Sequence, residues 1–355
     1  MSTGSTDQPG NTPGALMAKE IAEQPEVLTR ILDAGLPRIR KVAAEISAAA
    51  PRFVLLAARG TSDHAALYAK YLFEIQLGSP VGLASPSTMT AYGAKPDLRD
   101  VLFVGVSQSG GSPDLVGSLR TARECGALTL AVTNAPESPL ASEAQLHIDV
   151  LAGPEKAVAA TKSYTAELLA LYLLVDALRG GDGSSADAVV DATSQLVSNP
   201  DPIKSVGRRF LGAERLVVTG RGYAYPTARE AALKLMETSY VSAQAFSGAD
   251  LLHGPMAMLQ EGSAVIAVDP GGVSGTAIKP VIDKLVGLDT NLAIVGPANT
   301  GNETTAHLPL PAGLPEELSP IAEIVPLQML AHELAVIRGY DPDAPRGLRK
   351  VTETW

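Results

Sequence analysis

The sequence is poor in cysteine, histidine, aromatic residues and positive charge, and each scarcity excludes a class of protein. Its 355 residues include one cysteine, Cys125, so an intramolecular disulfide framework is excluded. The five histidines are scattered without metal-ligand spacing, and we expect neither a metal nor a cofactor. A formal net charge of −10 provides no positive field for DNA, RNA or an anionic membrane, so neither nucleic acid nor a membrane is an expected partner.

Long apolar runs and a secretion signal are also missing. No uninterrupted apolar stretch is long enough to cross a membrane. Residues 1–14 are rich in Ser, Thr, Gly and Pro and lack the basic and apolar regions of a signal peptide, which predicts a flexible start and a cytoplasmic location. The 46% hydrophobic content is typical of a well-packed soluble protein, and the length predicts two domains.

Apolar runs alternate with helical stretches along the chain. Two helices are predicted first, over 16–36 and 39–49. Strands then follow near 53–56, 82–84, 101–106, 128–133 and 147–150, with helices near 64–77, 113–124 and 164–179. This alternation predicts α/β architecture with parallel strands, and ligands on such sheets bind at the carboxyl ends of the strands.

The second half of the chain repeats the first. Residues 216–222 mirror 54–60, so that Gly60 and Gly222 lie 162 positions apart (222 − 60); Gly110 and Gly272 share that spacing (272 − 110). We predict a first half over 15–185, a second half with its connector over 186–340, and a tail over 341–355. The helix at 164–179 is expected either inside one half or at a dimer seam.

Three polar stretches follow predicted strands and precede helices, where backbone N–H and hydroxyl donors suit a phosphate, although ordinary turns use the same residue types. The candidates are Ser107, Gln108, Ser109 and Ser112 in one stretch, Arg59, Gly60, Thr61 and Ser62 in another, and Val158 and Ala160 in the third. Neither the P-loop nor the dinucleotide fingerprint is matched. In the second half Asp269 replaces the serines, so one half is expected to hold the anion.

Titratable residues gather in the second half. Glu230, Lys234 and Glu237 share one face of a helix predicted over 226–240, as either a solvated stripe or a wall of a cleft. His253 lies in a loop, where a histidine is structural or acts in acid–base chemistry. The cationic tail, which includes Lys350, is either a frayed end or a cover for an anion site.

Together these pieces resemble the sugar-isomerase (SIS) family, specifically the isomerase part of glucosamine-6-phosphate synthase and its shorter relatives. The resemblance covers nearly the whole chain, from Glu20-Ile21 and Gln24-Pro25 onward. Its distinctive parts are Gly60-Thr61-Ser62, Ser107-Gln108-Ser109-Gly110, Ala159-Ala160-Thr161-Lys162, Glu230 with Lys234 and Glu237, His253-Gly254-Pro255, and Asp343-Ala344-Pro345-Arg346 with Lys350. It implies two tandem flavodoxin-like SIS domains and a homodimer with its active site at the subunit interface.

The resemblance also implies roles for residues. The sugar's 6-phosphate would be bound by Ser107, Gln108, Ser109 and Ser112, with Thr61 and Ser62 beside the sugar. Glu237 would move the proton between C1 and C2, and Lys234 would support the enolamine charge. His253 of the partner subunit would open the sugar ring, and Lys350 would meet the sugar carbonyl.

Three departures from the synthases bear on function. The glutamine-hydrolysing part with its N-terminal cysteine has no counterpart, so glucosamine synthesis is not expected. Arg59 stands where the synthases have a small residue, as in deaminase-like relatives. Ala160 replaces a serine that touches the sugar, and Gly111 replaces a glutamate, so the sugar contacts have changed.

Four functions remain open on the sequence alone. The first is deamination of glucosamine 6-phosphate to fructose 6-phosphate and ammonia. The same proton abstraction on N-acetylglucosamine 6-phosphate could expel water, which makes a dehydratase the second. A fructosamine 6-phosphate deglycase is the third, and a non-catalytic sugar-phosphate sensor is the fourth.

Overall fold

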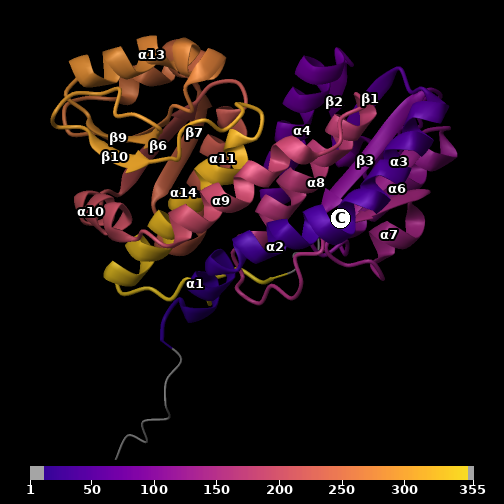
Figure 1. Ribbon diagram of the computed structural model, residues 1–355, viewed down its shortest axis with the longest axis horizontal. Coiled ribbons are helices and arrows are strands. Elements are labelled where there is room, and N and C mark those ends of the chain that lie inside the picture. The colour runs from indigo at the N-terminus through magenta and orange to yellow at the C-terminus, as the bar shows by residue number, and fades with distance from the viewer. Residues whose placement is uncertain (1–11, 351–355) are drawn as a thin grey trace, which may run out of the picture.

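Two α/β halves lie next to each other in the computed structural model, which describes residues 12–350 (Figure 1). Each half is built on a five-stranded parallel sheet, with strand orders β2-β1-β3-β4-β5 and β10-β9-β8-β6-β7. When the second sheet is numbered from its own first strand, it has the same order as the first. Both halves therefore share the flavodoxin-like order, and the predicted fold class is confirmed.

The first half places helices on both faces of its sheet. Its strands are β1 (Phe53–Ala57), β2 (Val81–Leu83), β3 (Val101–Ser107), β4 (Leu128–Thr133) and β5 (Leu146–Asp149). Its helices are α4 (Thr61–Leu77), α5 (Pro86–Thr90), α6 (Pro113–Glu124), α7 (Pro139–Glu143) and α8 (Lys162–Leu178). The central strand β3 is a continuous apolar run because α5, α6 and α7 cover one face and α4 and α8 the other.

The second half repeats this arrangement. Its strands are β6 (Arg215–Gly220), β7 (Ser242–Ser247), β8 (Ala264–Val268), β9 (Asn291–Gly296) and β10 (Ala306–Pro309). Its helices are α11 (Ala224–Ser239), α12 (Gly248–Leu252), η3 (Pro255–Met258), α13 (Gly272–Gly287) and α14 (Ser319–Ile337). In Figure 1, α13 lies on the outer side of this half, whereas α11 and α14 lie on the side that faces the first half.

The N-terminal helices and the connector join the two halves. The single helix expected over 16–36 is divided into α1 (Ala15–Ala22), α2 (Gln24–Arg30) and a π-helical turn, η1 (Ile31–Gly35), which leads into α3 (Leu36–Ala49). The connector contains η2 (Ser184–Ala186), α9 (Asp187–Val197) and α10 (Asp201–Arg209). Because α1 packs on α14 while α3 packs on α8, this N-terminal region bridges both halves.

Two long apolar helices are core helices of this chain. In α8 every residue from Lys162 to Asp176 is buried, mainly against α3 and α4, so α8 lies inside the protein rather than at a dimer seam. Among residues 12–350, α14 is long and apolar enough to cross a membrane by length and composition, although polar residues such as Glu323 and Gln328 interrupt it. Since 72% of its apolar window is buried in the protein, α14 belongs to the core of the second half.

The tail folds back along α1. Asp343 accepts hydrogen bonds from the backbone N–H groups of Leu16 and Met17, at 2.8 Å each, and so caps the start of α1. Arg346 stacks over the ring of Tyr240 at 4.2 Å from its centroid. The frayed-end interpretation is therefore wrong as far as residue 350. Residues 351–355, and residues 1–11 of the predicted flexible start, lie outside the described residues.

Candidate active site

A cavity of about 310 Å³ opens where the loops after β1 and β3 meet α11 and the tail. Its lining comes from segments far apart in the chain: Arg59, Gly60, Thr61, Ser62, Ser107, Gln108, Ser109, Ser112, Val158, Ala160, Glu237, Leu348, Arg349 and Lys350. All the residues predicted to bind phosphate or sugar are among them, together with two of the four predicted catalytic residues. Of the other two, Lys234 lies behind the Glu237 side chain, and His253 lies outside the cavity.

The loop after β3 is arranged to donate hydrogen bonds. The hydroxyl oxygen of Ser107 accepts the N–H of Gly110 at 3.1 Å, and that of Ser109 accepts the N–H of Gly111 at 3.3 Å. Each hydroxyl keeps its own proton for an anion in the cavity, because these bonds use only its lone pairs. The turn requires glycine at position 110, where φ is +59° and a Cβ would collide with Ser138.

The two halves differ at the corresponding helix start. In the first half, α6 begins with no capping hydrogen bond from the Ser112 side chain, but Pro113 has no N–H and the N–H of Leu115 is bonded to Asp114 Oδ1 at 2.9 Å, so among its first three residues only Asp114 keeps a backbone N–H for an anion. In the second half, Glu316 accepts the N–H groups of Val273 and Ser274 at the start of α13, both at 2.8 Å. A carboxylate from a distant part of the chain thus occupies the helix start in the second half; that the first half alone holds a phosphate stays a prediction.

The start of α8 does not offer the free donors expected of the third stretch. The N–H groups of Thr161 and Ser163 are bonded to the buried Glu155 carboxylate at 2.9 and 3.1 Å. Val158 and Ala160 line the cavity from the preceding loop instead. No local pattern in the sequence singled out Glu155, which lies six residues before the first N–H group that it caps.

Glu155 also holds the tail lysine. The ammonium of Lys350 donates to Glu155 Oε2 at 2.9 Å and to the carbonyl oxygen of Ala157 at 2.7 Å. Burial by itself would raise the pKa of Glu155, but Lys350 and the hydrogen bonds from Thr161 and Ser163 outweigh burial and lower that pKa. Lys350 is therefore anchored to an ionised carboxylate at the wall of the cavity.

The charged face of α11 points inward, so a solvated stripe is the wrong interpretation. Lys234 Nζ lies 2.5 Å from Glu237 Oε2, 3.0 Å from Thr61 Oγ1 and 3.3 Å from Glu230 Oε1. Burial alone would lower the pKa of Lys234, but the Glu230 and Glu237 carboxylates raise it above its ordinary value. Only Glu237, with 21% of its side chain exposed, reaches the cavity, so Lys234 is a fixed cation behind it.

Two further residues support this wall. His64 Nδ1 lies 2.7 Å from Glu230 Oε2, and both side chains are buried. The Thr61 hydroxyl donates to Glu230 Oε1 at 3.1 Å while it accepts from Lys234, so it presents only a lone pair to the cavity. The sequence did not single out His64, although its position three residues after Thr61 places both on one face of α4.

Arg59 and His253 differ in their relation to the cavity. The Arg59 guanidinium lines it and pairs with Asp114 Oδ2 at 2.7 Å, which ties the loop after β1 to the start of α6. His253 follows α12, is exposed, and does not line the cavity of this chain. Within the described chain, His253 thus contributes nothing to this cavity.

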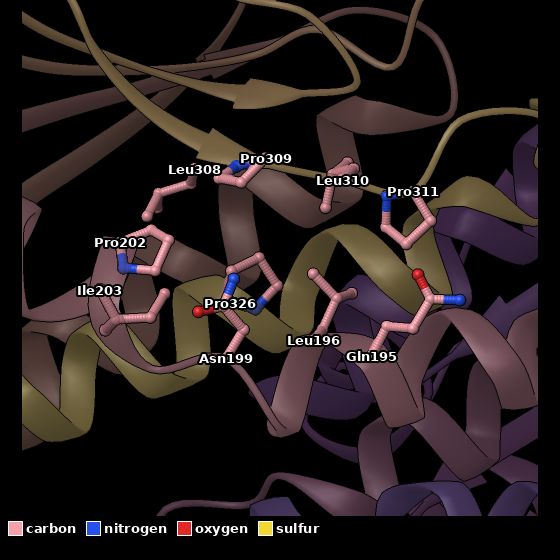
Figure 2. Close-up of a pocket in the computed structure, with 10 residues that line it drawn as sticks. All are labelled: Gln195, Leu196, Asn199, Pro202, Ile203, Leu308, Pro309, Leu310, Pro311 and Pro326. Atoms are coloured by element: carbon pink, nitrogen blue, oxygen red, sulfur yellow. The ribbon is translucent and has the colours of Figure 1, made fainter.

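A different cavity, of about 240 Å³, lies between the connector and the second half (Figure 2). Figure 2 shows it enclosed by apolar side chains from α9, α10, β10 and its following loop, and α14, with Gln195 and Asn199 as its polar members. It contains no charged or nucleophilic side chain. This second cavity therefore offers no group for acid–base or nucleophilic chemistry.

The comparisons with known proteins agree with this geometry. The family model for the SIS domain matches residues 49–177 and 210–338, one copy in each half. The chain belongs to the SIS domain family. It is 34% identical over 349 residues to a glutamine–fructose-6-phosphate aminotransferase (isomerizing) of Thermococcus kodakarensis, a match that covers 94% of this chain and 57% of that protein. This SIS protein thus spans little more than half the length of that relative.

Solved structures show the same fold. The C-terminal domain of glucosamine-fructose-6-phosphate aminotransferase from Francisella tularensis superposes with a TM-score of 0.84 at 27% identity, covering 95% of this chain and 99% of that one. Glucosamine-6-phosphate deaminase from Thermotoga maritima gives a TM-score of 0.78 at 22% identity, covering 96% of this chain and 100% of that one, a likeness of fold alone. The SIS protein is therefore homologous to the isomerase domain of the aminotransferases.

Proposed function

We propose that this SIS protein is an isomerising deaminase that converts glucosamine 6-phosphate and water to fructose 6-phosphate and ammonia. One observation carries the proposal: the Glu237 carboxylate, fixed by the buried Lys234, opens on the same cavity as the donor loop of Ser107 and Ser109. A general base and an anion-binding loop in one cavity suit proton transfer on a phosphorylated sugar.

In the proposed reaction, the residues on each wall of the cavity have a different role. The donor loop binds the 6-phosphate and so holds the sugar's other end toward Glu237. Glu237 takes the proton from C2 and returns it to C1, which converts the open-chain amino aldehyde to a C2 imine. The Lys234 ammonium, 2.5 Å from Glu237, holds that carboxylate in place at the cavity wall. Water then adds to C2, the C–N bond breaks, and ammonia leaves.

We also propose that the active protein is a homodimer in which His253 of the partner subunit completes the site by opening the sugar ring. This part rests on the resemblance and on the exposure of His253 outside the cavity of its own chain. Replacing His253 with Gln should therefore slow turnover of the cyclic sugar. Equal rates for the wild type and this variant would contradict the assignment.

The test of the reaction uses two sugars. Purified protein is incubated separately with glucosamine 6-phosphate and N-acetylglucosamine 6-phosphate, and both ammonia and product mass are followed. Ammonia with fructose 6-phosphate from the free amine is the expected result. Loss of water from the acetylated sugar, without ammonia from either, would instead identify a dehydratase, and binding without change would indicate a sensor.

Glu237→Gln is the matched variant for this assay. It keeps the size of the side chain but removes the base, so turnover should fall by a factor of about 10² to 10⁴ while binding of fructose 6-phosphate persists. Unchanged turnover would exclude Glu237 as the base.

A further inference from the structure

A buried carboxyl lies directly behind the cavity wall. Glu167 on α8 is 1% exposed, and its Oε1 lies 2.9 Å from the hydroxyl oxygen of Ser62, which lines the cavity. Its other oxygen, Oε2, has no hydrogen-bond partner among residues 12–350. Glu167 is thus a carboxyl group with a single polar contact, and that contact is a residue of the proposed binding site.

Among residues 12–350, no cation pairs with Glu167 to balance a negative charge on it. The charged groups that act on it are the carboxylates of Glu155 and Glu230, which both oppose its ionisation. The nearby ammonium groups have other partners, since Lys350 pairs with Glu155 and Lys234 pairs with Glu230 and Glu237. An unpaired buried carboxylate is strongly disfavoured, so the group keeps its proton.

The other elements packed on α8 do not favour ionisation of Glu167 either. On α4, His64 is bonded to Glu230, and on α14, Glu323 is bonded to Ser319 and Thr227. Within the described residues, α2 and α3 contribute neither a hydrogen bond nor an ion pair to Glu167. Tyr164, one turn earlier on α8, has a buried hydroxyl without a partner. Burial and the two carboxylates accordingly raise the pKa of Glu167 to about 8, against the opposing effect of the Ser62 hydrogen bond.

We propose that Glu167 is a positioning residue that, as a neutral acid, donates its proton to the Ser62 oxygen and so leaves the Ser62 hydroxyl proton free to bind a sugar phosphate. An ionised Glu167 would reverse the hydrogen bond: Ser62 would donate to Glu167 and present only lone pairs to the cavity. The hydroxyl and phosphate oxygens of a sugar phosphate both accept hydrogen bonds, so that reversal removes one donor from the site. This inference rests on the proposed sugar-phosphate ligand, whereas the protonation state of Glu167 does not.

The sign of the pH dependence follows from this arrangement. Affinity for a sugar phosphate is expected to be constant while Glu167 is neutral and to fall as pH rises through about 8. The ligand's own phosphate ionises near pH 6, below this window. Loss of one donated hydrogen bond corresponds to a dissociation constant about tenfold larger.

Calorimetric titration with fructose 6-phosphate between pH 6.5 and 9.5 tests the proposal in the wild type, Glu167→Gln and Ser62→Ala. The side-chain amide introduced by E167Q can donate to Ser62 at every pH, so we expect a flat profile for this variant. The wild type should lose about tenfold in affinity above pH 8. S62A should bind weakly and show no such loss. A flat wild-type profile, or the same loss in E167Q, would overturn the proposal.

Infrared spectroscopy without any ligand provides the independent measurement. The difference between the spectra of the wild type and E167Q at pH 7 should show the band of one protonated buried carboxyl, which disappears above pH 8; Glu323, whose pKa is raised to about 7, is present in both proteins and cancels in the difference. An ionised Glu167 at pH 7 would overturn the inference whether or not the protein turns over glucosamine 6-phosphate. Conversely, absence of ammonia release, with this band and the pH-dependent binding intact, would contradict only the proposed deaminase.

Discussion

Replacing Lys234 with methionine should destabilise the protein more than any surface charge change of the same kind. Its side chain is 1% exposed and lies between two carboxylates, one of which, Glu230, is fully buried. Breaking a buried ion pair from one side costs about 3–5 kcal/mol, because the remaining charge is left without its partner. His64 and Thr61 still bond to Glu230, so we expect the lower value, about 3 kcal/mol.

Differential scanning calorimetry measures this effect. For a folding unit the size of one half, about 3 kcal/mol corresponds to a decrease in Tm of roughly 6–12 °C. Because the pKa of Lys234 is raised in the folded state, its contribution is fully present below its unfolded pKa and is lost only as pH rises through the folded pKa. The decrease in Tm should therefore be the same at pH 7 and pH 9.

Two control variants make the result interpretable. Lys279→Met removes an exposed pair with Asp283, at 2.8 Å and with 60% of the lysine side chain exposed, and should shift Tm by no more than about 2 °C. The double variant Lys234→Met/Glu230→Gln removes the orphaned charge as well, and should recover part of the loss. A Tm for Lys234→Met equal to that of Lys279→Met, or a double variant less stable than the single one, would refute the reasoning.

Three further predictions follow from the same geometry. Ser109→Ala should raise KM about tenfold with little change in kcat, because it removes one phosphate donor; an unaltered KM would exclude that role. Glu155→Gln should release Lys350 and speed tryptic cleavage after it, as followed by mass spectrometry, whereas equal cleavage rates would contradict the anchoring. Burial raises the pKa of Glu323 to about 7. Ionising this carboxyl therefore costs the folded state free energy, and the protein loses stability as pH rises from about 4.5 through 7. Glu323→Gln should therefore gain up to about 3 kcal/mol at pH 8.5 and nothing at pH 4, and an equal gain at both would contradict this assignment.

The sequence predicted those helices, strands and loops that have a clear pattern of apolar and polar residues over a few neighbouring positions. The strands near 101–106 and 128–133 were recognisable because central parallel strands are uninterrupted apolar runs. The loop at 107–112 was recognisable because hydroxyls and glycines follow such a run directly. In contrast, β10 was not predicted, since its four residues carry little apolar pattern. The first helix breaks at Glu23, where Pro25 in the first turn of α2 is a local signal that the expectation of one helix over 16–36 did not use.

The candidate site was predictable in its cavity-facing residues and in the charged face of α11, but not in the buried carboxyls Glu155 and Glu167. Thr61 and Ser62 follow a strand and precede a helix, so their position near the carboxyl end of the sheet could be derived. The buried carboxyls Glu155 and Glu167 carried no such signal, because each acts on a residue distant in sequence, Lys350 and Ser62 respectively. Acidic residues in such positions look like ordinary helix or loop residues until the fold brings their partners close.

Proton exchange at the sugar tests the central claim most directly. The protein is incubated with fructose 6-phosphate and ammonium, which together supply the C2 imine, in deuterated water, and deuterium at C1 is followed by NMR for the wild type and Glu237→Gln. The proposed mechanism predicts incorporation by the wild type and a rate at least about a hundredfold lower for the variant. Equal rates for the two proteins, or no incorporation by the wild type although it binds the sugar, would contradict the assignment of this cavity as the site of C1–C2 proton transfer.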